Sequence, residues 1–106
     1  MTEQEIKHRM SAIQKSILIS LYLLEKKLGS PIEVRKLRQI LNKERRERGV
    51  PDLQASNFAV SCKVLNQRGY LHKFRDKKTL YVAYKLTEKG SSEGEMEYIE
   101  MLKNID

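Results

Sequence analysis

Hydrophobic residues recur every three or four positions through the first quarter of the chain. The stripe they form contains Ile6, Met10, Ile13, Ile17, Leu21, Leu24 and Leu28. This spacing predicts one continuous helix over residues 3–28, opened by Thr2 and Glu5 as a capping box. Residues 17–24 are apolar on nearly every face and are expected to be buried. Residues 3–15 have only a thin apolar stripe, so this half of the helix is expected to project.

Two shorter helices are predicted next, over residues 32–48 and 53–68, separated by a Gly-Val-Pro-Asp break. Asp52 or Ser56 could cap the second of them. The apolar side of the first consists of Val34, Leu37, Ile40 and Leu41. The second is expected to face the core with Ala55, Phe58, Cys62 and Leu65. These patterns predict two helices that share one core.

A change to alternating periodicity follows the third helix. Residues 70–74 and 79–86 read as two strands joined by a turn over residues 75–78. A last helix is predicted after Gly90, with Ser91 or Ser92 as its cap. Its apolar stripe contains Met96, Ile99 and Leu102, and its other faces are acidic. The expected fold class is therefore mainly α with a small β hairpin (α+β), in one small domain spanning residues 1–106.

The charge of the chain is uneven and points to a polyanionic partner. The net charge is +7, but residues 33–78 carry thirteen basic and five acidic side chains, a net +8. The segment 79–106 carries a net −3. This asymmetry predicts that the middle of the chain binds nucleic acid while the end stays away from it. The basic run 43–48 has two interpretations, contact with DNA or a solvated helix end.

Several other classes of protein are disfavoured. Cys62 lies on the predicted core face and is expected to be a buried apolar residue. His8 and His72 have no metal-ligand neighbours at a suitable spacing, so neither a metal nor a cofactor is expected. No catalytic triad or phosphate-binding loop is present, so the protein is not expected to be an enzyme. The charged start lacks a signal-peptide pattern, and no apolar run spans a membrane, which predicts a cytoplasmic protein.

The outer face of the helix over 53–68 is nearly uncharged, which is unusual in so basic a chain. It contains Ser56, Val60, Lys63 and Gln67, with Asn57 and Val64 on a flank. A solvated face would usually carry lysine and glutamate. Small polar and apolar side chains are suited to hydrogen bonding with base edges or touching a thymine methyl group. This face is therefore a candidate for reading DNA sequence.

The segments LNQRGYL (65–71) and YKLTEKG (84–90) stand at the two ends of the predicted hairpin and carry a resemblance to a known family. Residues 17–90 resemble the winged helix-turn-helix superfamily, particularly its small MarR-like and PadR-like regulators. The resemblance implies a sequence-specific double-stranded DNA-binding protein with its third helix in the major groove. The implied groove contacts are Gln54, Ser56, Asn57, Val60, Lys63 and Gln67. The implied wing contacts to phosphate or minor groove are Arg75, Lys77 and Lys78.

The resemblance also implies further partners. Arg38, Arg45 and Arg46 are expected to contact the DNA backbone from the second helix. A homodimer is expected, through the projecting start of the chain (1–16) or the C-terminal helix (91–106). The candidate dimer residues are Ile6, Met10, Ile13, Met96, Ile99 and Leu102. No effector-sensing segment is evident, so a small-molecule effector is not expected, and a nucleoid-associated transcriptional regulator is the leading hypothesis.

Two alternatives stay open on the same fold. A plasmid or viral centromere-binding partition protein would also use a small basic winged domain. A winged helix can also serve as a protein-docking module without DNA, but such a module should present a contiguous apolar patch, and only Val60 and Val64 are apolar on the outer helix face. Double-stranded RNA is disfavoured because its A-form major groove is too narrow for a helix.

Overall fold

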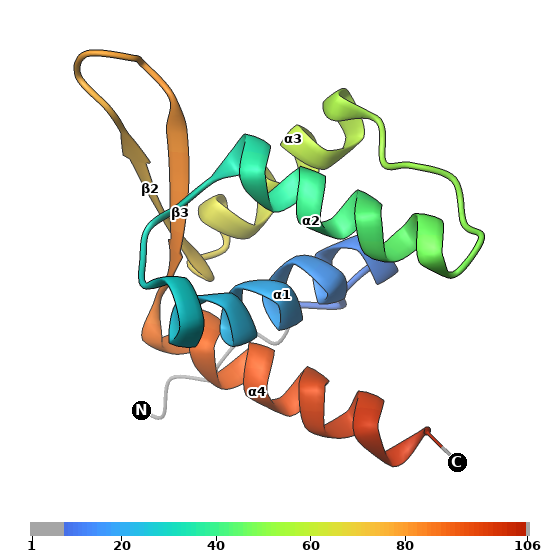
Figure 1. Ribbon diagram of the computed structural model, residues 1–106. Helices are drawn as coiled ribbons and strands as arrows, with labels where there is room; N and C mark the ends of the chain where they lie inside the picture. Colours follow the sequence, from blue (N-terminus) through green and yellow to red (C-terminus); the bar gives the residue numbers. More distant parts are fainter. Residues whose placement is uncertain (1–7, 106) are drawn as a thin grey trace, which may run out of the picture.

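The computed structural model describes residues 8–105 and has a helical body from which a β hairpin projects (Figure 1). Helix α1 lies at its centre, with α2 and α3 packed on one side and α4 on the other. The fold class predicted from the sequence is confirmed. In chain order the elements are α1 (Ala12–Leu28), β1 (Ile32–Glu33), α2 (Val34–Glu47), α3 (Ala55–Gln67), β2 (Leu71–Arg75), β3 (Val82–Leu86) and α4 (Glu88–Lys103).

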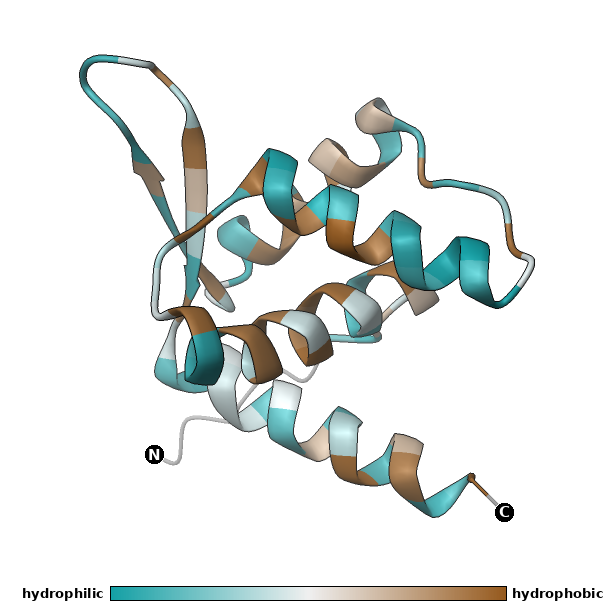
Figure 2. Ribbon diagram, viewed as in Figure 1, coloured by the Kyte–Doolittle hydropathy of each residue, from teal (hydrophilic) through white to brown (hydrophobic). Residues whose placement is uncertain are grey.

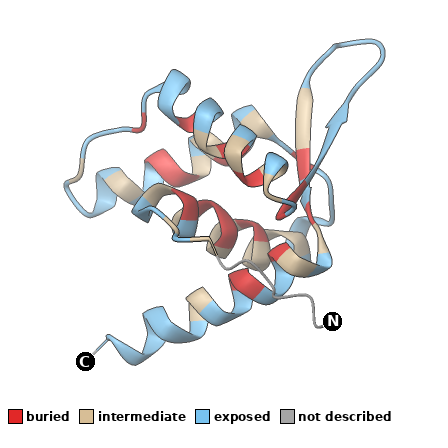
Figure 3. Ribbon diagram, turned by 180° about the vertical axis from the view of Figure 1, so that it is seen from behind, coloured by how far each residue is buried: buried red, intermediate tan, exposed pale blue. Residues whose placement is uncertain are grey.

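The core lies where the inner faces of α1, α2 and α3 meet the base of the hairpin (Figure 3). Hydrophobic residues concentrate on these facing sides (Figure 2). The largest side chains with almost no exposure are Tyr70, Phe58, Ile17, Leu18, Leu21, Leu37, Leu65 and Leu71. The outer half of the hairpin and most of α4 are exposed, so these two regions stand outside the core on different sides of the molecule (Figure 3).

The first helix starts later than the sequence predicts. Residues 8–11 are not helical, and α1 begins at Ala12. The side chain of Ser11 accepts a hydrogen bond from the backbone N–H of Gln14, and the Gln14 side chain accepts one from the N–H of Ser11. This capping box fixes the helix start at Ala12, because both backbone amides are satisfied there. The proposed Thr2–Glu5 box and Ile6 lie outside the described residues.

The sheet has a third strand that the periodicity did not indicate. Residues Ile32 and Glu33, expected in the second helix, pair antiparallel with Tyr84 and Ala83 of β3. The strand order is β1-β3-β2, so β3 is central and carries ladders on both sides. Two residues are too short for a periodic signal, and pairing with a distant strand decides their conformation.

Further element boundaries also differ from the predictions. Helix α3 begins at Ala55, which is exposed rather than in the core, and neither Asp52 nor Ser56 caps it. Arg75 belongs to β2, and the connection to β3 covers residues 76–81, longer than the predicted turn. Helix α4 begins at Glu88, capped by the Thr87 side chain rather than by a serine after Gly90.

Two glycines inside α4 allow this helix to approach the body closely. A Cβ at Gly90 would overlap the carbonyl oxygen of Tyr70, and one at Gly94 would lie 2.9 Å from the carbonyl oxygen of Leu18. Both obstacles are backbone atoms, which cannot rotate away. Glycine therefore sets the distance of α4 from α1 and from the start of the hairpin.

Candidate nucleic-acid interface

The outer face of α3 is exposed along its length. The residues predicted to contact the groove, Gln54, Ser56, Asn57, Val60, Lys63 and Gln67, are all exposed. Phe58, Cys62 and Leu65 occupy the opposite, buried face, as predicted. Gln54 is the N-cap rather than a helical residue, and its side chain makes no capping hydrogen bond. A largely uncharged helix face is therefore presented to solvent on the side of α3 opposite the core.

The start of α3 is fixed by a buried asparagine that sequence reasoning missed. The Asn42 side chain accepts a hydrogen bond from the Leu53 N–H at 2.7 Å and donates one to the Leu53 carbonyl at 3.5 Å. Nη1 of Arg38 donates to the same carbonyl at 3.2 Å. Asn42 is only 6% exposed, and Leu53 packs in the core. In the sequence, the role of Asn42 could be suspected only from its place directly after the apolar position Leu41.

The α2–α3 loop uses two of the arginines predicted to contact DNA. Nε of Arg45 donates to the Pro51 carbonyl at 2.7 Å. The Arg46 guanidinium forms a bidentate ion pair with Asp52, with Nε 2.9 Å and 3.1 Å from the two carboxylate oxygens. The hydrogen bonds from Arg46 hold the pKa of Asp52 below its usual value. These side chains order the loop, and a contact with the DNA backbone stays a prediction for them.

The wing tip is organised by one aspartate. Oδ1 of Asp76 accepts hydrogen bonds from the backbone N–H groups of Lys78 and Thr79, both at 2.8 Å. These N–H groups lower the pKa of the Asp76 carboxyl. The backbone of Asp76 also binds Leu80 and Tyr81 across the turn, at 2.8 Å and 2.9 Å. Such local bonds give the tip a defined conformation, and the predicted wing contacts Arg75, Lys77 and Lys78 are all exposed on it.

A second missed feature joins the wing to the helical body. The guanidinium carbon of Arg35, in the first turn of α2, lies 3.8 Å from the centre of the Tyr81 ring. Arg35 also pairs with Glu33 of β1 at 3.4 Å. The stacked arginine braces the β2–β3 connection, where it enters β3, against α2.

The residues predicted to form a dimer are of two kinds. Met10 and Ile13 are partly buried against the chain's own core. Met96, Ile99 and Leu102 of α4 are 54%, 45% and 46% exposed. Met101 and Ile105 are also exposed beside them. The large apolar surface left uncovered in this region therefore lies on α4.

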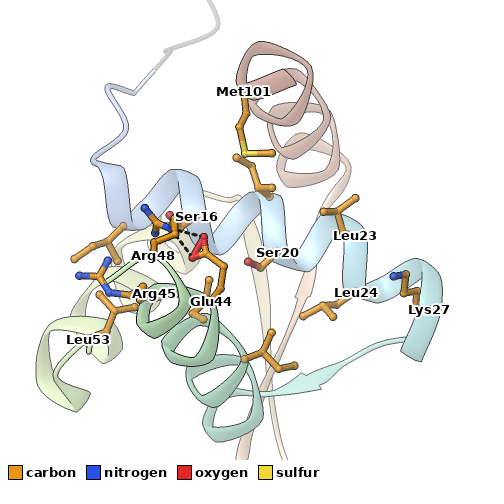
Figure 4. A pocket seen from close by; sticks show the side chains of 14 residues that line it. Ser16, Ser20, Leu23, Leu24, Lys27, Glu44, Arg45, Arg48, Leu53 and Met101 are labelled. Carbon is orange, nitrogen blue, oxygen red and sulfur yellow. Dashed lines mark hydrogen bonds and ion pairs between the residues drawn. The ribbon is translucent and has the colours of Figure 1, made fainter. Parts of the chain in front are cut away.

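An open groove of about 340 Å³ lies between α1 and α2, next to α4 (Figure 4). Ile19, Leu23, Leu24 and Ile40 supply apolar walls, and Met101 reaches its edge from α4. Its rim carries the basic side chains Lys27, Arg45 and Arg48. The volume suits a small ligand, and the expectation that no effector binds stays a prediction.

Residues 8–105 were also compared with the requirements of a metal site, a membrane span and a reactive thiol. This part of the chain contains no cluster of three histidine, cysteine, aspartate or glutamate side chains able to hold a metal ion. None of the described helices is long and apolar enough to cross a membrane. Burial raises the pKa of the Cys62 thiol to about 12, which removes the thiolate form needed for reactivity.

The helix α3, its buried support on α1 and α2, and the following hairpin define a winged helix-turn-helix fold, the fold of winged-helix transcriptional regulators. Solved structures with this fold include the following three. A point mutant of Lactococcus lactis ZitR has 14% identity and a TM-score of 0.64 over 97% of this chain. SSV1 F-93 has 21% identity and a TM-score of 0.65 over 93%. The adhesin competence repressor AdcR of Streptococcus pyogenes has 15% identity and a TM-score of 0.62 over 92%.

The shared length differs among these structures. This chain spans 60% of ZitR and 69% of AdcR, but 98% of F-93. At such identities the likeness concerns the fold alone. No protein-family model and no curated protein sequence matches the chain.

Proposed function

We propose that this protein binds double-stranded DNA in a sequence-dependent manner and regulates transcription at the nucleoid, with α3 in the major groove. The observation that carries the proposal is the common orientation of α3 and the wing. The first turn of α3 and the tip of the hairpin both extend away from α4, on the same side of the body (Figure 1). A weakly charged helix beside a basic hairpin combines base readout with phosphate contacts.

Charge supports this orientation. The basic segment 33–78 contains α2, α3 and the outer wing, whereas the acidic segment 79–106 contains α4 on the other side of α1. A polyanion would therefore approach the α3 side and be repelled from α4. The lysines and arginines would supply affinity by releasing counterions from phosphate, without reading sequence.

Fluorescence anisotropy with a random-sequence duplex of about 30 base pairs tests the electrostatic part. We expect binding that weakens by about 10³-fold or more between about 50 and 200 mM salt, as several phosphate contacts require. The double substitution of Lys77 and Lys78 to alanine should weaken binding to every sequence. Lys103→Ala, which removes a charge from α4, is the matched control and should bind as the wild type does. No binding at either salt would overturn the proposal and leave a protein-docking role.

Base readout has a separate test. After in vitro selection of a preferred site, Asn57→Ala should change the selected sequence, because it removes an amide suited to an adenine edge. Arg75→Ala should instead lower affinity uniformly, since phosphate contacts carry no sequence information. Equal effects of the two substitutions on all duplexes would contradict the assignment of Asn57 to base readout.

We propose further that α4 forms a homodimer with a second copy. Its exposed stripe lies next to the α1–α2 groove, because Met101, which is exposed beside the stripe, also lines the groove. Glu95 and Glu100 on α4 are exposed. The groove rim carries Lys27, Arg45 and Arg48 together with one acid, Glu44, which pairs with Arg48. The remaining positive charge of the rim would face the acidic helix of the second copy. A two-fold dimer would read half-sites separated by about one helical turn, roughly 34–36 Å.

Sedimentation equilibrium tests this arrangement. The wild type is expected at twice the 12.4 kDa chain mass. Ile99→Glu should yield monomer because it places a charge in the apolar interface. Ser92→Glu, an exposed change on the same helix, should remain dimeric. A monomeric wild type at micromolar concentration would contradict the dimer but would not affect the DNA surface.

A further inference from the structure

The outer part of the wing carries apolar side chains among its charges. Phe74, Leu80 and Tyr81 are 45%, 61% and 42% exposed. They lie in the segment 74–81, which also contains Arg75, Lys77 and Lys78. Figure 2 shows a hydrophilic turn followed by a hydrophobic segment before β3. Phosphate contacts require only the cations, so the apolar side chains need another explanation.

Leu80 has the most unusual conformation of the three. Its φ is 63°, and it is the single non-glycine residue with positive φ among residues 8–105. Leucine occupies this left-handed region unfavourably, whereas glycine or asparagine would adopt it at little cost. An exposed leucine gains little from burial in its own fold. A strained apolar residue on a projecting tip therefore suggests a binding role rather than a folding role.

The surrounding bonds hold Leu80 in place. Its N–H donates to the Asp76 carbonyl at 2.8 Å, and the carbonyl of the next residue, Tyr81, accepts from the Asp76 N–H at 2.9 Å. Tyr81 in turn stacks on Arg35 of α2. The tip is thus ordered before any partner binds, so presenting the leucine would need little further loss of chain entropy.

From these observations we propose that Leu80 is an apolar wedge that enters the DNA minor groove beside the α3 site and partly unstacks one base step. This inference rests on the proposed DNA binding. Lys77 and Lys78 would hold the phosphates on either side of the groove while the leucine side chain presses between bases. Apolar wedges of this kind kink the duplex toward the major groove. The preferred target is a pyrimidine–purine step, because such steps unstack most easily.

The experiment uses the full chain and the duplex selected by the wild type. End-to-end energy transfer reports bending, and 2-aminopurine at the flanking step reports unstacking. We expect the wild type to bend the duplex and raise 2-aminopurine fluorescence. Leu80→Asn, which suits the positive φ, should lose both signals and bind the selected site at least about tenfold more weakly, the scale of one lost base-step contact. Leu80→Met retains an apolar side chain and should keep both signals.

Two further measurements separate the possible outcomes. The salt dependence of random-duplex binding should be the same for Leu80→Asn and the wild type, since the cations are unchanged. The thermal midpoint of Leu80→Asn should be equal or higher, which excludes misfolding as the cause. A Leu80→Asn variant that bends the duplex normally would overturn the wedge alone. A wild type that binds phosphatidylserine vesicles but no duplex would overturn both the wedge and the proposed function.

Discussion

Gly90→Ala tests whether α4 is positioned by backbone contact. An added Cβ would overlap the Tyr70 carbonyl oxygen, lie 2.9 Å from the Tyr70 carbonyl carbon and 3.2 Å from Cδ2 of Leu86. The same carbonyl accepts a hydrogen bond from the Thr87 N–H at 3.1 Å. The helix start must therefore move away, which separates the cap of α4 from the exit of α3.

The expected change in the free energy of unfolding is the balance of opposing effects. Alanine in place of glycine favours a helix by about 1 kcal/mol. Overpacking against atoms that cannot rotate away costs about 1–3 kcal/mol or more, and loss of the hydrogen bond between Thr87 and Tyr70 adds about 1 kcal/mol. We expect a net loss of about 3 kcal/mol in the free energy of unfolding, the upper end of the roughly 1–3 kcal/mol that these effects give together, because the obstacle is backbone. For a domain of this size, that loss lowers the thermal midpoint by roughly 10–25 °C.

Urea denaturation followed by circular dichroism measures this change. Gly94→Ala should give an intermediate loss of about 1–2 kcal/mol, because its nearest contacts, the Leu18 oxygen at 2.9 Å and the Tyr22 Cβ at 3.1 Å, overlap less. Ser92→Ala, an exposed control between them, should be neutral or stabilise by a few tenths of a kcal/mol. A Gly90→Ala variant as stable as the wild type would refute the reasoning.

Three other predictions concern polar groups that are buried or partly buried in the body. Asn42→Ala should lower the free energy of unfolding by about 1–3 kcal/mol, because the Leu53 N–H loses its partner. The exposed control Gln39→Ala should change it little, and equal urea midpoints for the two variants would contradict the role of Asn42. Cys62 should resist a disulfide reagent under mildly alkaline conditions in the native protein and react only after unfolding, since burial raises its pKa to about 12; rapid native labelling would show that the thiol is accessible. Burial also raises the pKa of Glu25, whose Oε2 accepts a β3 backbone N–H at 2.7 Å. The folded state then holds that proton more tightly than the unfolded state, so stability should fall as pH rises from the ordinary carboxyl pKa through the raised one. Glu25→Gln should remove that fall in urea midpoints measured against pH, and an unchanged profile would contradict it.

The periodic segments of the sequence determined most of the fold. The stripes along α1, α2 and α3, and the alternation along β3, specify which faces are buried, because burial of apolar surface needs no knowledge of a distant partner. The same logic identified the outer face of α3, since residues opposite a buried face must be exposed. The cations of the wing were expected to be exposed because the tip of a hairpin projects from the body, and Arg75, Lys77 and Lys78 are exposed.

Only the tertiary structure decided the contacts that join distant segments. The strand of Ile32 and Glu33 exists because β3 lies beside it, and the start of α3 is fixed by Asn42 from the preceding helix. The left-handed conformation of Leu80 likewise depends on hydrogen bonds across the whole turn. Such features arise from single hydrogen bonds and close approaches rather than from a repeated pattern, so a periodic analysis of the sequence has no signal from which to predict them.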